Sequence, residues 1–114
     1  NEDEREIFYC TRTGANAQAV YTNEGLVVLK GSTGLLNPKG KSRADLVNAR
    51  DRLIESGVLA VEGEFTRFTK DWLFSTPSGA SNAVVVMPSN GWREWKTASG
   101  ITLDELHRSG PASE

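Results

Sequence analysis

The residues best able to do covalent or metal chemistry are few in this chain. It holds one cysteine, Cys10, and one histidine, His107. A cysteine nucleophile needs a nearby base, and a zinc site needs three or four ligands. Cys10 lies in a β-prone stretch, where a small buried hydrophobe is expected, and His107 is expected on a surface helix. The acidic residues show no metal-ligand spacing, so the sequence predicts no enzyme, no catalytic residue, no metal site and no cofactor.

A glycine-rich segment beside lysines raises a second kind of chemistry, the binding of nucleotide phosphates. Residues 31–42 read GSTGLLNPKGKS and end in a Gly-Lys-Ser tripeptide. The phosphate-binding loop pattern needs a glycine five positions before Gly40, where this chain has Leu35. Pro38 also removes a backbone donor from the region where amides would converge on a phosphate. We therefore expect a plain loop over 31–40.

The basic side chains are concentrated in one part of the chain. Residues 25–54 carry six lysines and arginines and two aspartates, while the whole chain has a formal charge of −2. Such a segment could contact DNA phosphates, although strong sequence-independent binders are far more basic overall. A solvated helix face is the simpler interpretation, and both stay open.

Two of the three tryptophans, Trp92 and Trp95, follow an Asn-Gly pair. A strand over 92–97 would point them to opposite faces, so we expect Trp92 in the core and leave Trp95 open as a base-stacking residue. Hydroxyls at 75, 76, 78 and 81 are expected to cap a helix rather than hold a phosphate. The candidate nucleic-acid contacts are then Lys39, Lys41, Arg43, Arg50, Arg52, Arg93, Trp95 and Lys96.

The elements that would position these residues follow from periodicity, capping signals and turn residues. In chain order we expect a strand at 6–11, a hairpin of strands 15–21 and 26–30, a helix at 42–56, a hairpin of 58–61 and 64–69, a helix at 77–87 opened by Thr76 and Pro77, a strand at 92–97 and a helical turn at 102–108 with a Thr102–Glu105 capping box.

These elements predict an α+β fold, an antiparallel β-sheet of hairpins with one longer helix (about 42–56) and one or two short helices packed on it. A chain of 114 residues is expected to form a single domain, 1–114, with an ordered core at about 5–108 and flexible ends. It begins with Asn1, which suggests a fragment of a larger protein. With one cysteine and no long apolar run, we expect a cytoplasmic protein that makes no membrane contact.

Four motifs give the chain a family resemblance. They are VVLKGS at 27–32, FSTPSGASNAVV at 74–85, NGWREWK at 90–96 and GITLDEL at 100–106. As an ordered set they resemble an uncharacterised bacterial domain family found at the carboxyl end of GIY-YIG nucleases and in restriction–modification proteins. The second half is also similar to the RAMA domain. Relatives tend to carry a glycine after the second helix, where this chain has Pro88 and Ser89.

The resemblance implies an accessory module, because proteins of this kind pair it with a nuclease or methylase. DNA binding, with reading of modified bases, is proposed for RAMA domains. The expected function is therefore a non-catalytic DNA-binding module of a bacterial nuclease or restriction–modification protein. The alternative is a protein-interaction or dimerisation module that positions a catalytic domain. Expected partners are DNA and the parent's other domains, and the oligomeric state stays open.

Overall fold

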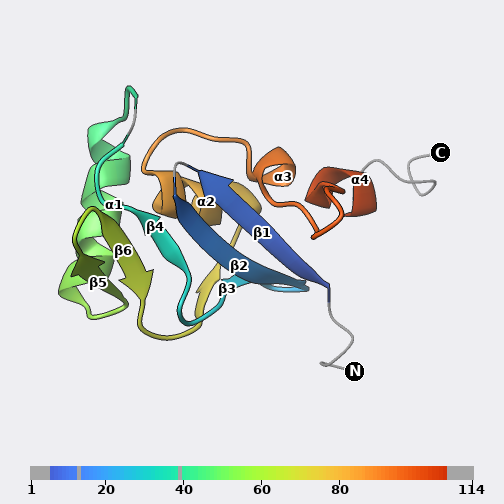
Figure 1. Cartoon of the computed structure of the whole chain (residues 1–114), viewed down its shortest axis with the longest axis horizontal. Helices are drawn as coiled ribbons and strands as arrows, with labels where there is room; N and C mark the ends of the chain where they lie inside the picture. The colour runs from blue at the N-terminus through green and yellow to red at the C-terminus, as the bar shows by residue number, and fades with distance from the viewer. Residues whose placement is uncertain (1–5, 13, 39, 108–114) are drawn as a thin grey trace.

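The computed structural model describes residues 6–12, 14–38 and 40–107, which form an α+β fold as predicted. Two antiparallel sheets lie side by side with helices packed on them (Figure 1). The strands are β1 (Ile7–Arg12), β2 (Ala15–Thr22), β3 (Gly25–Val28), β4 (Thr33–Leu35), β5 (Leu59–Glu62), β6 (Phe65–Phe68) and β7 (Trp72–Phe74), and the helices are α1 (Ala44–Glu55), α2 (Pro77–Val85), α3 (Gly91–Glu94) and α4 (Leu103–His107).

The larger sheet has the strand order β1-β2-β3-β7 and is antiparallel throughout. The period of two along β2 places Ala15, Ala17 and Ala19 on the buried face of the sheet. The predicted hairpin between β2 and β3 is confirmed. Its turn requires glycine, because Gly25 has φ of +142° and a Cβ there would lie 2.1 Å from the Phe74 carbonyl oxygen.

The smaller sheet has the order β4-β6-β5, and its β5–β6 hairpin around Gly63 was also predicted. The expectation of a plain loop over 31–40 is wrong in part, since β4 pairs with β6 there. β7 was not expected at all. Both missed strands are three residues long, too short for an alternating pattern to distinguish them from a loop.

Helix α1 occupies one end of the molecule and helices α3 and α4 the other, with the sheets between them (Figure 1). The predicted helix at 42–56 is confirmed by α1, which ends before Gly57 at φ of +88°. α1 packs on β5 and α2, and only Arg50 is buried along its length.

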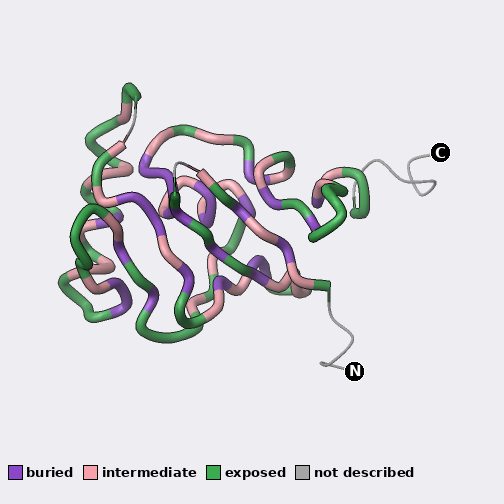
Figure 2. The backbone as a smooth tube through the Cα atoms, viewed as in Figure 1, coloured by how far each residue is buried: buried purple, intermediate pink, exposed green. Residues whose placement is uncertain are grey.

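Helix α2 lies behind the larger sheet and supplies much of the core (Figure 2). The Thr76 hydroxyl oxygen accepts a hydrogen bond from Gly79 N at 3.0 Å, and Pro77 occupies the first turn, as predicted. The helix ends at Val86, which adopts a left-handed conformation with φ of 55°. The core of buried apolar residues comprises Phe8, Cys10, Ala17, Ala19, Leu26, Val28, Val58, Leu59, Phe68, Ala80, Val84, Val85, Trp95 and Leu103.

The predicted strand at 92–97 is wrong. Residues 91–94 form the short helix α3, and only Lys96 makes single bridges, to Tyr9 and Thr102. The Asn90 side chain accepts a hydrogen bond from Trp92 N at 3.1 Å, so the Asn-Gly pair begins a helix instead of turning a hairpin. Asparagine serves in both roles, and the sequence does not distinguish them.

Helix α4 was predicted correctly. The Thr102 and Glu105 side chains form the expected capping box, with Thr102 N donating to Glu105 Oε1 at 2.9 Å and Glu105 N donating to Thr102 Oγ1 at 3.1 Å. The ends beyond 6–107, for which flexibility was expected, lie outside the described residues.

Candidate nucleic-acid interface

Hydrogen bonds between side chain and backbone hold the start of α2 against both ends of α3. Trp95 Nε1 donates a hydrogen bond to the Pro77 carbonyl at 3.1 Å, and Gly91 N donates to Ser78 Oγ at 2.9 Å. A Cβ on Gly91 would lie 2.1 Å from the Pro77 carbonyl carbon and oxygen. We call these contacts the α2–α3 lock. It joins the Thr-Pro-Ser and Asn-Gly-Trp motifs, and the close approach explains why position 91 needs glycine.

The lock removes Trp95 from the candidate contacts. Its side chain is 0% exposed, so it has no face to offer a base. Trp92 was expected to be buried in the core and is only half-buried. Its ring packs against Tyr21, with ring centroids 5.7 Å apart. The error follows from the strand prediction, since a helical turn changes the direction of both side chains.

The hydroxyl groups near α2 bind the protein itself. Ser81 Oγ contacts Ser78 O at 3.2 Å and Ser89 Oγ at 2.6 Å, while Thr76 and Ser78 accept the backbone bonds described above. The capping interpretation of this cluster is confirmed for Thr76. The cluster therefore gives no phosphate site.

The basic residues of α1 divide into structural and exposed ones. Arg50 is buried, and it donates to the Leu36 carbonyl and to Asp51 Oδ1, the latter at 2.9 Å. It ties α1 to the segment after β4, so its assignment as a DNA contact is wrong.

The remaining cations of this group lie in or beside α1. Arg43 is exposed and pairs with Asp45 at 3.1 Å, while Lys41 and Arg52 are also exposed. Lys39 lies outside the described residues.

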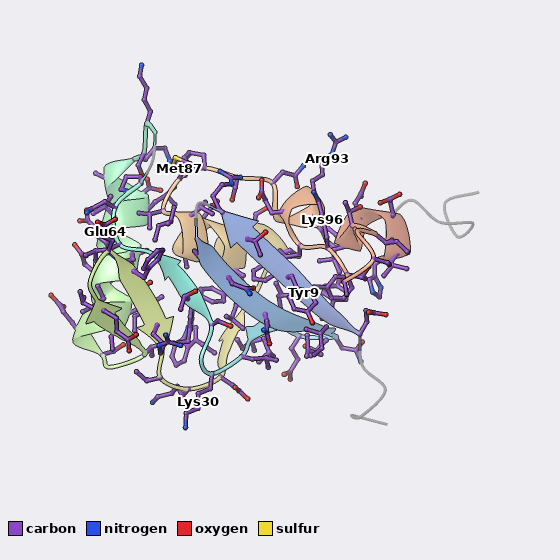
Figure 3. All side chains as sticks on the ribbon, in the orientation of Figure 1. Tyr9, Lys30, Glu64, Met87, Arg93 and Lys96 are labelled. Atoms are coloured by element: carbon purple, nitrogen blue, oxygen red, sulfur yellow. The ribbon has the colours of Figure 1, made fainter. Side chains whose placement is uncertain are left out.

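Arg93 and Lys96 are exposed and lie close together beside α3 (Figure 3). They line an open pocket of about 380 Å³, together with Thr102, Asp104 and Glu105. Glu94, between them in sequence, turns away and pairs with Arg12 at 2.8 Å. The pocket thus presents two cations, Arg93 from α3 and Lys96 from the segment just after it.

Two carboxylates line the same pocket. The Thr102 backbone amide, and then its hydroxyl, hold the pKa of Glu105 below its usual range by hydrogen bonding to the ionised form. The carboxylate is therefore ionised at neutral pH and limits how much negative charge the pocket accepts.

The predicted contacts do not form one surface. Lys41, Arg43 and Arg52 belong to the α1 end, and Arg93 and Lys96 to the α3 end, along a molecule 42 Å in its longest dimension (Figure 1). The sequence does not show that these two groups of cations are far apart, because the sheets that lie between α1 and α3 separate them.

A family model for DUF4357, a domain of unknown function, matches residues 8–107. The chain belongs to this family. No curated protein and no solved structure matches it. The DUF4357 match runs from β1 to α4 and so includes the α2–α3 lock and the Arg93–Lys96 pocket.

The DUF4357 domain has a second hollow, which the sequence did not lead us to expect. An apolar groove of about 250 Å³ lies between α1 and α2. Its α1 wall consists of Leu46, Ala49 and Leu53, and its other wall of Phe74, Gly79, Asn82 and Ala83. The only signal in the sequence is the set of small residues, Ala49, Gly79 and Ala83, which keeps the two helices from filling the space between them.

The single cysteine of the DUF4357 domain is unreactive by environment. Cys10 is fully buried, and burial, with a smaller effect of Glu94, raises its pKa to about 12. Within 6–12, 14–38 and 40–107, no three His, Cys, Asp or Glu side chains are grouped to hold a metal ion. No helix in these ranges is long and apolar enough to cross a membrane.

Proposed function

We propose that this DUF4357 domain is a non-catalytic accessory module of a bacterial nuclease or restriction–modification protein, and that it contacts DNA through Arg93 and Lys96. The observation that carries the proposal is the placement of two exposed cations on one open pocket at the end of the domain. Guanidinium and ammonium groups bind phosphate oxygens, and two on one surface can contact neighbouring phosphates.

The expected contact is weak and made to the DNA backbone. The chain has a formal charge of −2, and Asp104 and Glu105 line the same pocket. Because Trp95 is buried, it supplies no stacking contact. Binding should therefore depend on salt and little on sequence, with the parent protein supplying cleavage or methylation.

The resemblance of the motifs at 74–106 to modules of nuclease and methylase proteins supports the accessory role. Those motifs contain the α2–α3 lock, which orients Arg93 and Lys96 without using them. The same fold can therefore present different side chains at positions 93 and 96.

The test is fluorescence anisotropy with a labelled duplex over a range of salt concentrations. The variant is Arg93→Ala/Lys96→Ala, and the control is Lys30→Ala/Lys70→Ala, which removes the same charge. Lys30 and Lys70 are exposed, and Lys30 lies on the edge of the molecule away from Arg93 (Figure 3).

Each phosphate contact contributes about 0.9 to the slope of log affinity against log salt, so the test variant should lose about 1.8. Its affinity at low salt should fall about tenfold or more relative to the control. Equal losses in the two variants would refute the pocket as the contact. No salt-sensitive binding by the unmodified domain would refute DNA binding.

The alternative function, a protein-interaction or dimerisation module, has its own supporting observation. The α1–α2 groove is apolar and shares no lining residue with the Arg93–Lys96 pocket. The two functions use different surfaces and can be tested separately.

A further inference from the structure

Helix α1 carries an apolar stripe that the domain covers only in part. Leu46, Ala49 and Leu53 follow at i, i+3 and i+7, the spacing of a helix-pairing seam. Leu46 and Leu53 are half-buried, Leu53 against the core, and Ala49 is exposed. The stripe forms one wall of the α1–α2 groove, so a second helix laid along it would contact α1 and reach towards α2.

Two residues of opposite charge flank this stripe and could pair between two copies of α1. Asp45 and Arg52 are both exposed and lie seven residues apart, which places them on one side of α1 about two turns from each other. When two identical helices pair antiparallel about a two-fold axis, residue i of one meets residue j of the other, and j meets i. Asp45 of each copy then lies opposite Arg52 of its partner.

We propose that α1 docks on α1 of a second copy of this chain, antiparallel and two-fold symmetric. This inference rests on the alternative function above and names its partner. Leu46 of one copy then packs over Ala49 of the other near the axis, where the small side chain allows close approach. Both flanking charge pairs are attractive in this register only, because parallel helices would place Asp45 beside Asp45 and Arg52 beside Arg52.

The existing contacts of the two charges permit this pairing. Asp45 pairs with Arg43 within the monomer at 3.1 Å, and both side chains are well exposed. Such surface pairs are weak and exchange readily. Arg52 lies on the outward side of α1, away from buried Arg50.

The seam is short, which sets the expected strength. A helix of 12 residues is about 18 Å long, so the interface is small and the dimer should be weak, with Kd in the micromolar to submillimolar range. Helices α3 and α4 lie at the end of the molecule opposite α1 (Figure 1), so the Arg93–Lys96 pocket beside them stays accessible in such a dimer.

The test is sedimentation velocity of the chain at increasing concentration up to about 1 mM. Asp45→Arg and Arg52→Asp each convert two attractive pairs into two repulsive ones and should weaken association about tenfold. The double variant Asp45→Arg/Arg52→Asp restores opposite charges and should restore association. Circular dichroism checks that α1 stays folded in each variant.

A disulfide experiment fixes the register. A mixture of the single variants Asp45→Cys and Arg52→Cys should form a mixed disulfide dimer, while either variant alone should form far less. Cys10 is buried and does not compete.

A chain that stays monomeric at the highest concentration, or a double variant that does not regain association, overturns the proposal. Suppose that the chain is monomeric but that Ala49→Glu, unlike the control Asn48→Glu, abolishes binding to the separately purified catalytic part of its parent. The groove would then bind a different partner; the second-copy inference would fall and the interaction function would stand.

Discussion

Substitution of Gly91 by alanine tests the α2–α3 lock most directly. The φ of Gly91 is not in the left-handed region, so a side chain costs nothing through backbone conformation. The cost is steric, since the new Cβ would lie 2.1 Å from the Pro77 carbonyl carbon and oxygen and 2.3 Å from Ser78 N. These are backbone atoms, and only movement of α2 away from α3 removes the overlap.

The magnitude follows from what that movement breaks. The Gly91–Ser78 and Trp95–Pro77 hydrogen bonds contribute about 1 kcal/mol each. Displacing the fully buried Trp95 costs further packing, and truncating a buried aromatic side chain costs about 3–5 kcal/mol. We expect a loss of about 3–5 kcal/mol, a large part of the total stability of a domain of this size.

The assay is urea unfolding followed by tryptophan fluorescence, with Gly57→Ala as the matched control. Gly57 has φ of +88° and open space around its Cβ position, so that substitution isolates the conformational cost, about 1 kcal/mol. Should Gly91→Ala prove no more destabilising than Gly57→Ala, the close approach of α2 and α3 would not be what holds this part of the fold.

The remaining predictions concern two buried groups. Arg50→Ala should lower the free energy of unfolding by about 2–3 kcal/mol, because Arg50 is buried and donates a hydrogen bond to the Leu36 carbonyl. Arg52→Ala should change it by less than about 0.5 kcal/mol, and thermal unfolding of the two variants measures the difference. The Cys10 thiol should not react with a disulfide reagent in the native protein and should react fully in denaturant. Since burial raises its pKa from 9.0 to about 12, the unfolded thiol ionises first, and stability should fall by up to about 1.4 kcal/mol per pH unit above pH 9. A Cys10→Ala control identifies the part of that fall due to the thiol.

The sequence predicted correctly the turns and helix starts that are specified by residues close together in the chain. The β2–β3 turn, the Thr76–Pro77 helix start and the Thr102–Glu105 capping box each depend on residues close in sequence, and each is present in the structure. β4 and β7 depend instead on distant partners, β6 and β3 respectively, which no local pattern indicates.

The second helix shows how a local rule can be overridden. Its left-handed C-cap is Val86, a β-branched residue that disfavours this conformation, rather than glycine. Val86 is fully buried, and its carbonyl accepts a hydrogen bond from Ser42 Oγ. Burial of the side chain offsets the backbone strain there.

The candidate site was less predictable than the fold. The basic run of 25–54 contained the buried Arg50, which the sequence could not distinguish from its exposed neighbour Arg52 without knowing the packing of α1. Trp95 was misassigned for a related reason, because its burial depends on the Pro77 carbonyl 18 residues away. Arg93 and Lys96 kept their exposure because they flank the lock without taking part in it.

The motif residues singled out in the sequence therefore act mainly inside the fold. In the segment from 90 to 96, Asn90 caps α3, Gly91 fits against Pro77, Trp95 fills the core and Glu94 holds β1 through Arg12. Each of these roles requires a particular residue type. The side chains of Arg93 and Lys96 are exposed and take no part in the hydrogen bonds of the α2–α3 lock. Substitutions at these two positions should therefore cost little stability, so the proposed DNA contact can be tested there without unfolding the domain.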